Sequence, residues 1–128
     1  MAGCKIDSEA SPQFQKLRER WKTSGYPSID TDLAEAFSNI QRDTRACHCR
    51  GPVPRFADVL KGYLLFKYRQ KNSAAKEGAS GGWRILALYN PKTHTLYPII
   101  VYPKKAMADA DDDSINAAIT ELLRDTLL

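Results

Sequence analysis

Three short segments rich in β-branched and aromatic residues decide the fold of this chain. They are separated by turn-forming residues, and segments of this length and composition are typical of β-strands. They therefore predict strands at about 63–70, 83–90 and 95–102. In order they read Tyr63-Leu-Leu-Phe-Lys-Tyr-Arg-Gln70, Trp83-Arg-Ile-Leu-Ala-Leu-Tyr-Asn90 and Thr95-Leu-Tyr-Pro-Ile-Ile-Val-Tyr102.

The last two predicted strands form a hairpin. Asn90-Pro-Lys-Thr-His94, which joins them, has the composition of a tight turn. Pro98 lies inside the third strand and cannot donate a backbone hydrogen bond to a neighbouring strand. We therefore expect either an edge position or a β-bulge at Pro98.

Two helices are predicted before these strands. Ser11 can cap the first helix, with Pro12 at its first position and an apolar stripe at Phe14, Leu17 and Trp21. The second begins near Asp30 or Thr31 and runs to about Arg42. Its apolar residues are Leu33, Ala34, Phe37 and Ile40. The short connection between the helices predicts a helical hairpin whose two stripes cover one face of the sheet.

A third helix is predicted at the C-terminal end of the sequence. Asp113 or Ser114 can cap it, and its apolar stripe consists of Ile115, Ala118, Ile119, Leu122 and Leu123. A short first strand is expected at 5–7, and residues 43–62 are expected to form a loop with one helical turn near Phe56–Leu60. Together these elements predict a single α+β domain over residues 1–128, with helices packed on a largely antiparallel sheet.

Charge is distributed unevenly along the 128 residues. Residues 61–105 contain nine Lys and Arg against the single acid Glu77, whereas residues 108–128 contain six acids against Arg124. A basic central region indicates a polyanionic partner, although a solvated basic surface has the same composition. No apolar run is long enough to cross a bilayer, and residues 1–7 lack the hydrophobic stretch of a signal peptide. A cytoplasmic protein without a membrane partner is expected.

The three cysteines do not suggest a disulfide framework. Their number is odd, and Cys47-His48-Cys49 lacks a second Cys/His pair at zinc-site spacing. Reduced thiols and no bound metal are therefore expected.

Cations alternate with apolar residues on the first long strand. Successive side chains of a strand point to opposite faces, so Lys67 and Arg69 lie on the face opposite Phe66 and Tyr68. The basic, glycine-rich segment between Lys71 and Gly82 follows directly, and its composition predicts mobility. Cations on rigid strands beside such a segment are suited to holding a phosphate chain.

From Gly51 onward the chain resembles the RelE/ParE superfamily of toxin–antitoxin toxins. The resemblance depends on the order and spacing of several weak motifs over some 60 residues. The helical N-terminal part resembles the family in layout only. The motifs are Phe66-Lys-Tyr-Arg69, Gly81-Gly-Trp-Arg-Ile-Leu86 and Val101-Tyr-Pro-Lys-Lys105.

The resemblance implies a RelE-like fold and a metal-independent, cofactor-free endoribonuclease that cuts mRNA on the ribosome. Lys67 would act as an acid or base, or would orient the phosphate. Arg69 and Arg84 would clamp the scissile phosphate. Lys104 would match the basic residue that follows the last strand in the family. The implied protein partner is an antitoxin, usually a small DNA-binding protein. Further RNA contacts are expected from Lys71, Lys76, Trp83, Tyr102 and Lys105. Core packing is an alternative for Trp83 and Tyr102, and Arg84 could instead pair with an acid such as Glu77 or Asp109.

Two other functions fit the sequence. Several ribosome-dependent members of the superfamily carry a late His-Tyr pair or tyrosine, whereas this chain has neither residue type after Tyr102. A non-catalytic binding module of the same fold, either a gyrase-directed inhibitor or a decayed toxin homologue, is therefore an alternative. An unrelated α+β scaffold for protein interaction is the other.

Overall fold

The computed structural model describes residues 4–53, 56, 58–73, 82–106 and 110–127. Its elements follow the predicted order, with one additional strand before the first long one. The helices and strands are β1 (Lys5–Ile6), α1 (Pro12–Thr23), α2 (Ile29–Arg42), η1 (Thr44–Ala46), β2 (His48–Pro52), β3 (Leu64–Gln70), β4 (Trp83–Asn90), β5 (Thr95–Pro103), α3 (Asp112–Leu122) and η3 (Leu123–Leu127).

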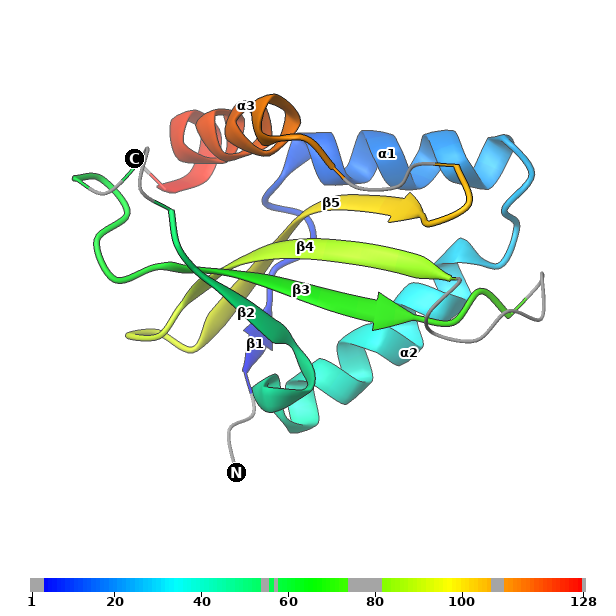
Figure 1. The fold of residues 1–128 in the computed structure, drawn as a ribbon, viewed down its shortest axis with the longest axis horizontal. Helices are drawn as coiled ribbons and strands as arrows, with labels where there is room; N and C mark the ends of the chain where they lie inside the picture. Colours follow the sequence, from blue (N-terminus) through cyan, green and yellow to red (C-terminus); the bar gives the residue numbers. More distant parts are fainter. Residues whose placement is uncertain (1–3, 54–55, 57, 74–81, 107–109, 128) are drawn as a thin grey trace.

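The strands form one sheet in the order β1-β5-β4-β3-β2 (Figure 1). β1 runs parallel to β5, and the other neighbours are antiparallel. The predicted α+β fold with a largely antiparallel sheet is thus confirmed. The register between β4 and β5 shifts where Leu86 faces Ile100 and Ala87 faces Pro98, so the bulge expected at Pro98 is present.

β2 corrects the prediction of a loop over residues 43–62. His48 pairs with Lys67 and Cys49 with Phe66, and the register then shifts before Pro52. Gly51 has a φ of 98°, a conformation open mainly to glycine, and it lies within this irregular stretch. A short, bulged edge strand containing glycine and proline lacks the alternating pattern by which strands are recognised.

The helices bury their apolar stripes against both faces of the sheet. On one face Phe37 and Ile40 of α2 pack with Phe66 and Tyr89. On the other face α3 contributes Ile115 and Ile119 to the cluster that contains Leu86 and Leu88. Alternate residues of β4 supply the two clusters, as the pleat of a strand requires.

α1 packs with α2 as the predicted helical hairpin requires, because Phe14 shares a core cluster with Ile29 and Leu33 of α2. α1 also reaches the cluster on the opposite face of the sheet. It runs beside β5 (Figure 1), and Leu17 and Trp21 contact the core clusters of both faces. The indole N–H of Trp21 donates to the carbonyl oxygen of Val101 at 2.9 Å. α1 therefore satisfies a backbone group of β5 that β1, pairing only at Thr95 and Leu96, does not reach.

The helix ends agree with the predictions except at α3. The hydroxyl of Ser11 accepts a hydrogen bond from the N–H of Phe14, and Pro12 opens α1 as expected. α3 begins earlier than predicted, because Asp111 rather than Asp113 or Ser114 is its N-cap and accepts from the N–H of Ser114. The expected turn after Phe56 is supported by hydrogen bonds from the N–H groups of Val59 and Leu60 to the Phe56 carbonyl.

A buried carboxylate connects α2 to both ends of the β3–β4 connection. Asp32 is fully buried and accepts hydrogen bonds from Trp83 Nε1 at 2.9 Å and from the hydroxyls of Ser73 at 2.7 Å and Ser28 at 2.9 Å. The backbone also approaches closely here, because a Cβ on Gly82 would overlap the Gln70 carbonyl oxygen. This contact fixes where β3 ends and β4 begins. The mobility predicted between Lys71 and Gly82 concerns residues 74–81, which lie outside the described residues.

Candidate functional site

β3 presents its cations on one face of the sheet. Lys67 is half-buried and Arg69 is exposed, whereas Phe66 is buried on the opposite face. This arrangement follows from the alternation of side chains along the strand. A rigid strand with paired neighbours on both sides therefore positions both cations.

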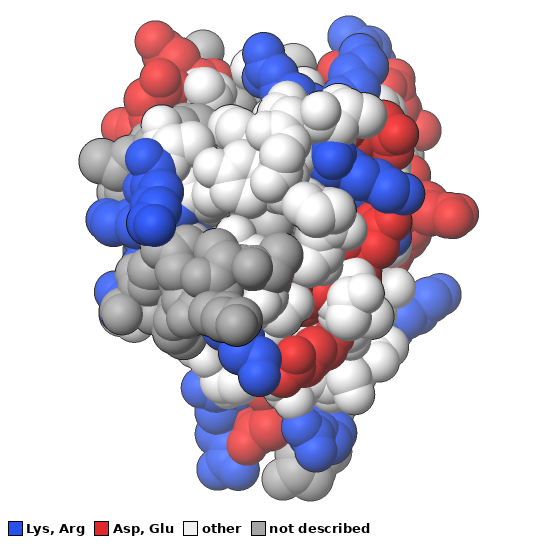
Figure 2. All heavy atoms as spheres, turned by 90° about the vertical axis from the view of Figure 1, so that its right-hand side faces the viewer, with Lys and Arg blue, Asp and Glu red and all other residues white. Residues whose placement is uncertain are grey.

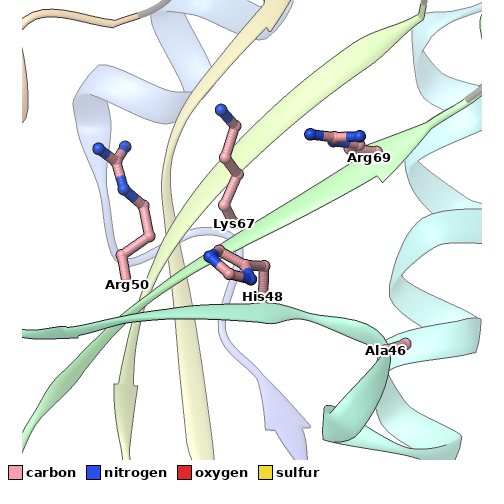
Figure 3. Close-up of a pocket in the computed structure, with 5 residues that line it drawn as sticks. All are labelled: Ala46, His48, Arg50, Lys67 and Arg69. Atoms are coloured by element: carbon pink, nitrogen blue, oxygen red, sulfur yellow. The ribbon is translucent and has the colours of Figure 1, made fainter. Parts of the chain in front are cut away.

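β2 adds a histidine and an arginine to the same face. His48 is directly opposite Lys67, and paired residues of antiparallel strands share a face. His48, Arg50, Lys67 and Arg69, with Ala46, line an open pocket of about 530 Å³. Figure 3 shows Arg50, Lys67 and Arg69 projecting from the same side of the two strands. None of the described residues lining this cationic pocket is a carboxylate.

His48 and Arg50 were not among the sequence-predicted site residues. The sequence did contain a signal for them, because His48 and Arg50 are polar residues on either side of Cys49. Polar residues at alternate positions have the two-residue period of a strand. The loop prediction obscured this period, because it placed 43–62 outside the sheet. In the sequence, His48 stands out only as the centre of the Cys-His-Cys motif.

Arg84 and Tyr102 lie on the same face as the cationic pocket but deeper in the sheet. Arg84 pairs with both Arg69 and Tyr102, so the three side chains form one row across β3, β4 and β5. Arg84 is 3% exposed and Tyr102 is 1% exposed. Arg84 is therefore not on the surface, because it lies on β4 between two paired strands and beside the core.

Trp83 lies outside the predicted site. Its side chain is on the other face, fully buried, and its indole N–H donates to Asp32. Lys71 is exposed, with its ammonium 4.0 Å from a carboxylate oxygen of Glu35 in α2. Lys76 is among the undescribed residues. None of these three residues adds a described contact to the cationic pocket.

The two lysines after β5 are exposed but are not among the described residues that line the pocket. The backbone N–H of Lys104 donates to the carbonyl oxygen of Gly82 at 2.9 Å, which continues the β4–β5 ladder by one residue. The structure therefore brings Lys67 and Arg69 together with His48 and Arg50. Arg84 is buried next to Arg69 on the neighbouring strand β4. Lys104 and Lys105 lie beyond the end of β5.

Charge at the end of the molecule where β3 ends is mixed. In Figure 2, Lys and Arg side chains lie around the periphery of this end, with Asp and Glu side chains between several of them. Residues of other types occupy much of the centre. The described cations of this end are thus interspersed with acids, whereas no carboxylate is among the described residues that line the cationic pocket.

The Cys-His-Cys motif gathers no ligand set in the described part of the chain. Among those residues, no three His, Cys, Asp or Glu side chains lie together as metal ligands would. His48 lines the cationic pocket, whereas Cys47, the residue just before β2, packs against the core cluster of Ile40 and Phe66. Burial, with a smaller contribution from Cys4, raises the pKa of the Cys47 thiol to about 12.

The raised pKa of Cys47 predicts an alkaline loss of stability. The folded protein retains the thiol proton above pH 9.0, the ordinary value, whereas the unfolded chain loses it there. The contribution of Cys47 to the free energy of unfolding is therefore complete below pH 9.0 and is lost as pH rises toward about 12. Urea unfolding across this range should show a shallower decline for Cys47→Ala than for wild type. Cys49→Ala, at an exposed thiol, should retain the wild-type slope; equal slopes for all three proteins would contradict the assignment.

The fold and the pocket define a class: a small α+β protein with a cationic pocket on one face of an antiparallel sheet. No family model matches the sequence, and no curated protein matches it. Among solved structures the chain is similar to an E. coli RelE toxin, a double arginine-to-alanine mutant in its free state. The identity is 12%, the TM-score is 0.44, and the match covers 94% of this chain and 97% of that one. The similarity concerns the fold; the chemistry must come from the residues of this chain.

Proposed function

We propose that this protein is a toxin-like endoribonuclease that cuts mRNA through attack of the neighbouring 2′-hydroxyl. The observation that carries the proposal is the convergence of His48, Arg50, Lys67 and Arg69 on one pocket. A phosphodiester in this pocket would meet three cations and an imidazole, which are the groups that such a cleavage needs.

The pocket residues can divide the work of the reaction. Neutral His48 accepts the proton of the 2′-hydroxyl as its oxygen bonds to phosphorus, and the ammonium of Lys67 gives a proton to the departing 5′-oxygen. Arg50 and Arg69 hold the non-bridging oxygens, since a guanidinium can donate two parallel hydrogen bonds and stabilise the growing charge. The products are a 2′,3′-cyclic phosphate and a 5′-hydroxyl, with one proton taken up and one released.

The proposal extends to the partners of the reaction. The mRNA would be cut on the ribosome, and an antitoxin would cover the cationic pocket until it is removed. No described helix is long and apolar enough to cross a membrane. We place the protein in the cytoplasm, where mRNA and ribosomes are found, and treat residues 1–128 as its single functional domain.

A non-catalytic binding module is the second candidate, and the burial of Arg84 and Tyr102 favours it. Arg84 is 3% exposed and Tyr102 is 1% exposed, so two predicted contacts with RNA offer little surface. The pocket would then bind phosphates without cutting, and the protein would act by occupying its target.

Cleavage products distinguish the two candidates. Ribosomes programmed with a defined mRNA are incubated with the purified protein, and the new RNA ends are identified. The nuclease is expected to leave 2′,3′-cyclic phosphates, and a single 2′-deoxy nucleotide at the cut site should abolish cleavage there. Binding of the RNA without new ends would support the binding module instead. If the deoxy substrate is still bound but is not cut, the 2′-hydroxyl is the attacking group.

A further inference from the structure

A second pocket of about 340 Å³ adjoins the cationic pocket, and Arg50 lines both. Its other walls come from the chain after β2, from β3 and from the first turns of α3. Residues far apart in the sequence thus meet beside the candidate phosphate site. The described residues on which the argument rests are Arg50, Val53, Leu65, Asp112, Ile115 and Asn116.

The floor of this second pocket is apolar. Val53 and Leu65 are each 8% exposed and Ile115 is 5% exposed, so their side chains belong to the core and offer a fixed surface. Such a surface is a poor place for a phosphate, which needs donors or cations. It suits the face of a flat ring, because burying apolar area is favourable for any aromatic ligand.

The rim of the second pocket carries hydrogen-bonding groups on one side. Asp112 and Asn116 are four residues apart on α3 and therefore lie on the same side of the helix. The carboxylate of Asp112 is exposed and offers two acceptor oxygens, while the amide of Asn116 offers both a donor and an acceptor. The negative charge of Asp112 would also keep phosphates on the cationic side of Arg50.

We propose that the second pocket holds a guanine base of the RNA, next to the phosphate bound at Arg50. This assignment rests on the proposed function, because it needs RNA in the cationic pocket. A nucleotide combines an anion with a flat, weakly polar ring, and the two adjoining pockets offer a matching pair of environments. Guanine presents two parallel donors, N1–H and the N2 amine, which one carboxylate can accept together. Adenine and cytosine place an acceptor beside their amine, and uracil has a single donor between two carbonyls.

The test measures binding of labelled RNA hexamers by fluorescence anisotropy. Every ribose carries 2′-O-methyl groups to prevent cleavage. The hexamers consist of uridine except at one internal position, which holds guanine, inosine, adenine, cytosine or uracil. Inosine retains N1–H but lacks the N2 amine, so it removes one of the two predicted hydrogen bonds.

The variant is Asp112→Asn, and Asp113→Asn is its control. Asp113 carries the same charge on the next residue of α3 but lines a different pocket, with Asn116 and Thr120. Both substitutions change the net charge equally. A difference between them therefore reports the position of the carboxylate rather than the overall electrostatic attraction of RNA.

Wild type and Asp113→Asn are expected to bind the guanine hexamer about tenfold more tightly than the uracil hexamer, with inosine between them. In Asp112→Asn the preference should fall below about threefold, because an amide cannot accept both donors. Equal affinity for all five hexamers in wild type would overturn the guanine assignment while leaving the cationic pocket as an RNA site. A guanine preference that survives in Asp112→Asn would overturn the role of Asp112. Failure of wild type to bind any hexamer would overturn the proposed function together with this inference.

Discussion

Replacing His48 with alanine should lower the rate constant of mRNA cleavage by about 10²- to 10⁴-fold, the usual contribution of a positioned general base. His48 is exposed on the edge strand β2 and faces the cationic pocket, so the loss should come from the chemical step rather than from unfolding. The measurement is a single-turnover time course with saturating protein.

The second histidine of the chain supplies the control. His94 is in the β4–β5 turn, where its Nδ1 lies 3.1 Å from the hydroxyl of Tyr89, and it is not among the residues lining the cationic pocket. His94→Ala should therefore cleave at the wild-type rate. Equal losses in the two variants would mean that the imidazole of His48 does not act as the general base.

Lys67→Ala should lower the cleavage rate constant by about as much as His48→Ala, since it removes the proposed acid.

Replacing Asp32 with alanine should lower the free energy of unfolding by about 3 kcal/mol. The carboxylate is fully buried and accepts hydrogen bonds from Trp83 Nε1, Ser73 and Ser28. Alanine would leave these donors buried without that acceptor. Urea unfolding, monitored by tryptophan fluorescence, measures the change.

Asp30 is the matched control for Asp32, because it lies in the same turn of α2. Its carboxylate pairs with Arg18 at 2.7 Å and Lys22 at 2.9 Å, and 40% of its side chain is exposed. These two cations lower the pKa of Asp30. A partly exposed ion pair contributes little, so Asp30→Ala should cost less than about 1 kcal/mol. Similar losses in the two variants would mean that the buried network around Asp32 is not what holds the β3–β4 connection.

The long, regular elements were predictable because their side-chain periods are strong. The stripes of α1 and α2 and the three apolar strands follow from residues such as Phe14, Phe37 and Ile85, all of which pack in the core. The bulge at Pro98 was predictable for a chemical reason, since proline lacks the backbone donor. Local capping rules, however, placed the start of α3 too late.

The candidate site was only half predictable. Lys67 and Arg69 follow from the period of β3, but Arg50 and His48 depend on β2, which is recognisable only through its pairing with β3. The burial of a polar side chain also cannot be predicted from the alternation of residues along a strand. Arg84 is directly opposite Arg69 on the same face of the sheet, yet Arg84 is 3% exposed whereas Arg69 is exposed. Exposure depends on the neighbours on either side of a strand, and these are set by the whole fold.

The central claim, that the cationic pocket holds RNA phosphates, is tested most directly by the salt dependence of RNA binding. The proteins compared are wild type, Arg50→Ala, Arg69→Ala and the control Lys92→Ala, whose exposed lysine lies in the β4–β5 turn. For single-stranded RNA each lost phosphate contact should reduce the slope of log affinity against log salt by about 0.7. We predict this reduction for each arginine variant and a wild-type slope for Lys92→Ala. Equal slopes in all four proteins, or an equal reduction in the Lys92 variant, would contradict a phosphate site in the pocket of His48, Arg50, Lys67 and Arg69.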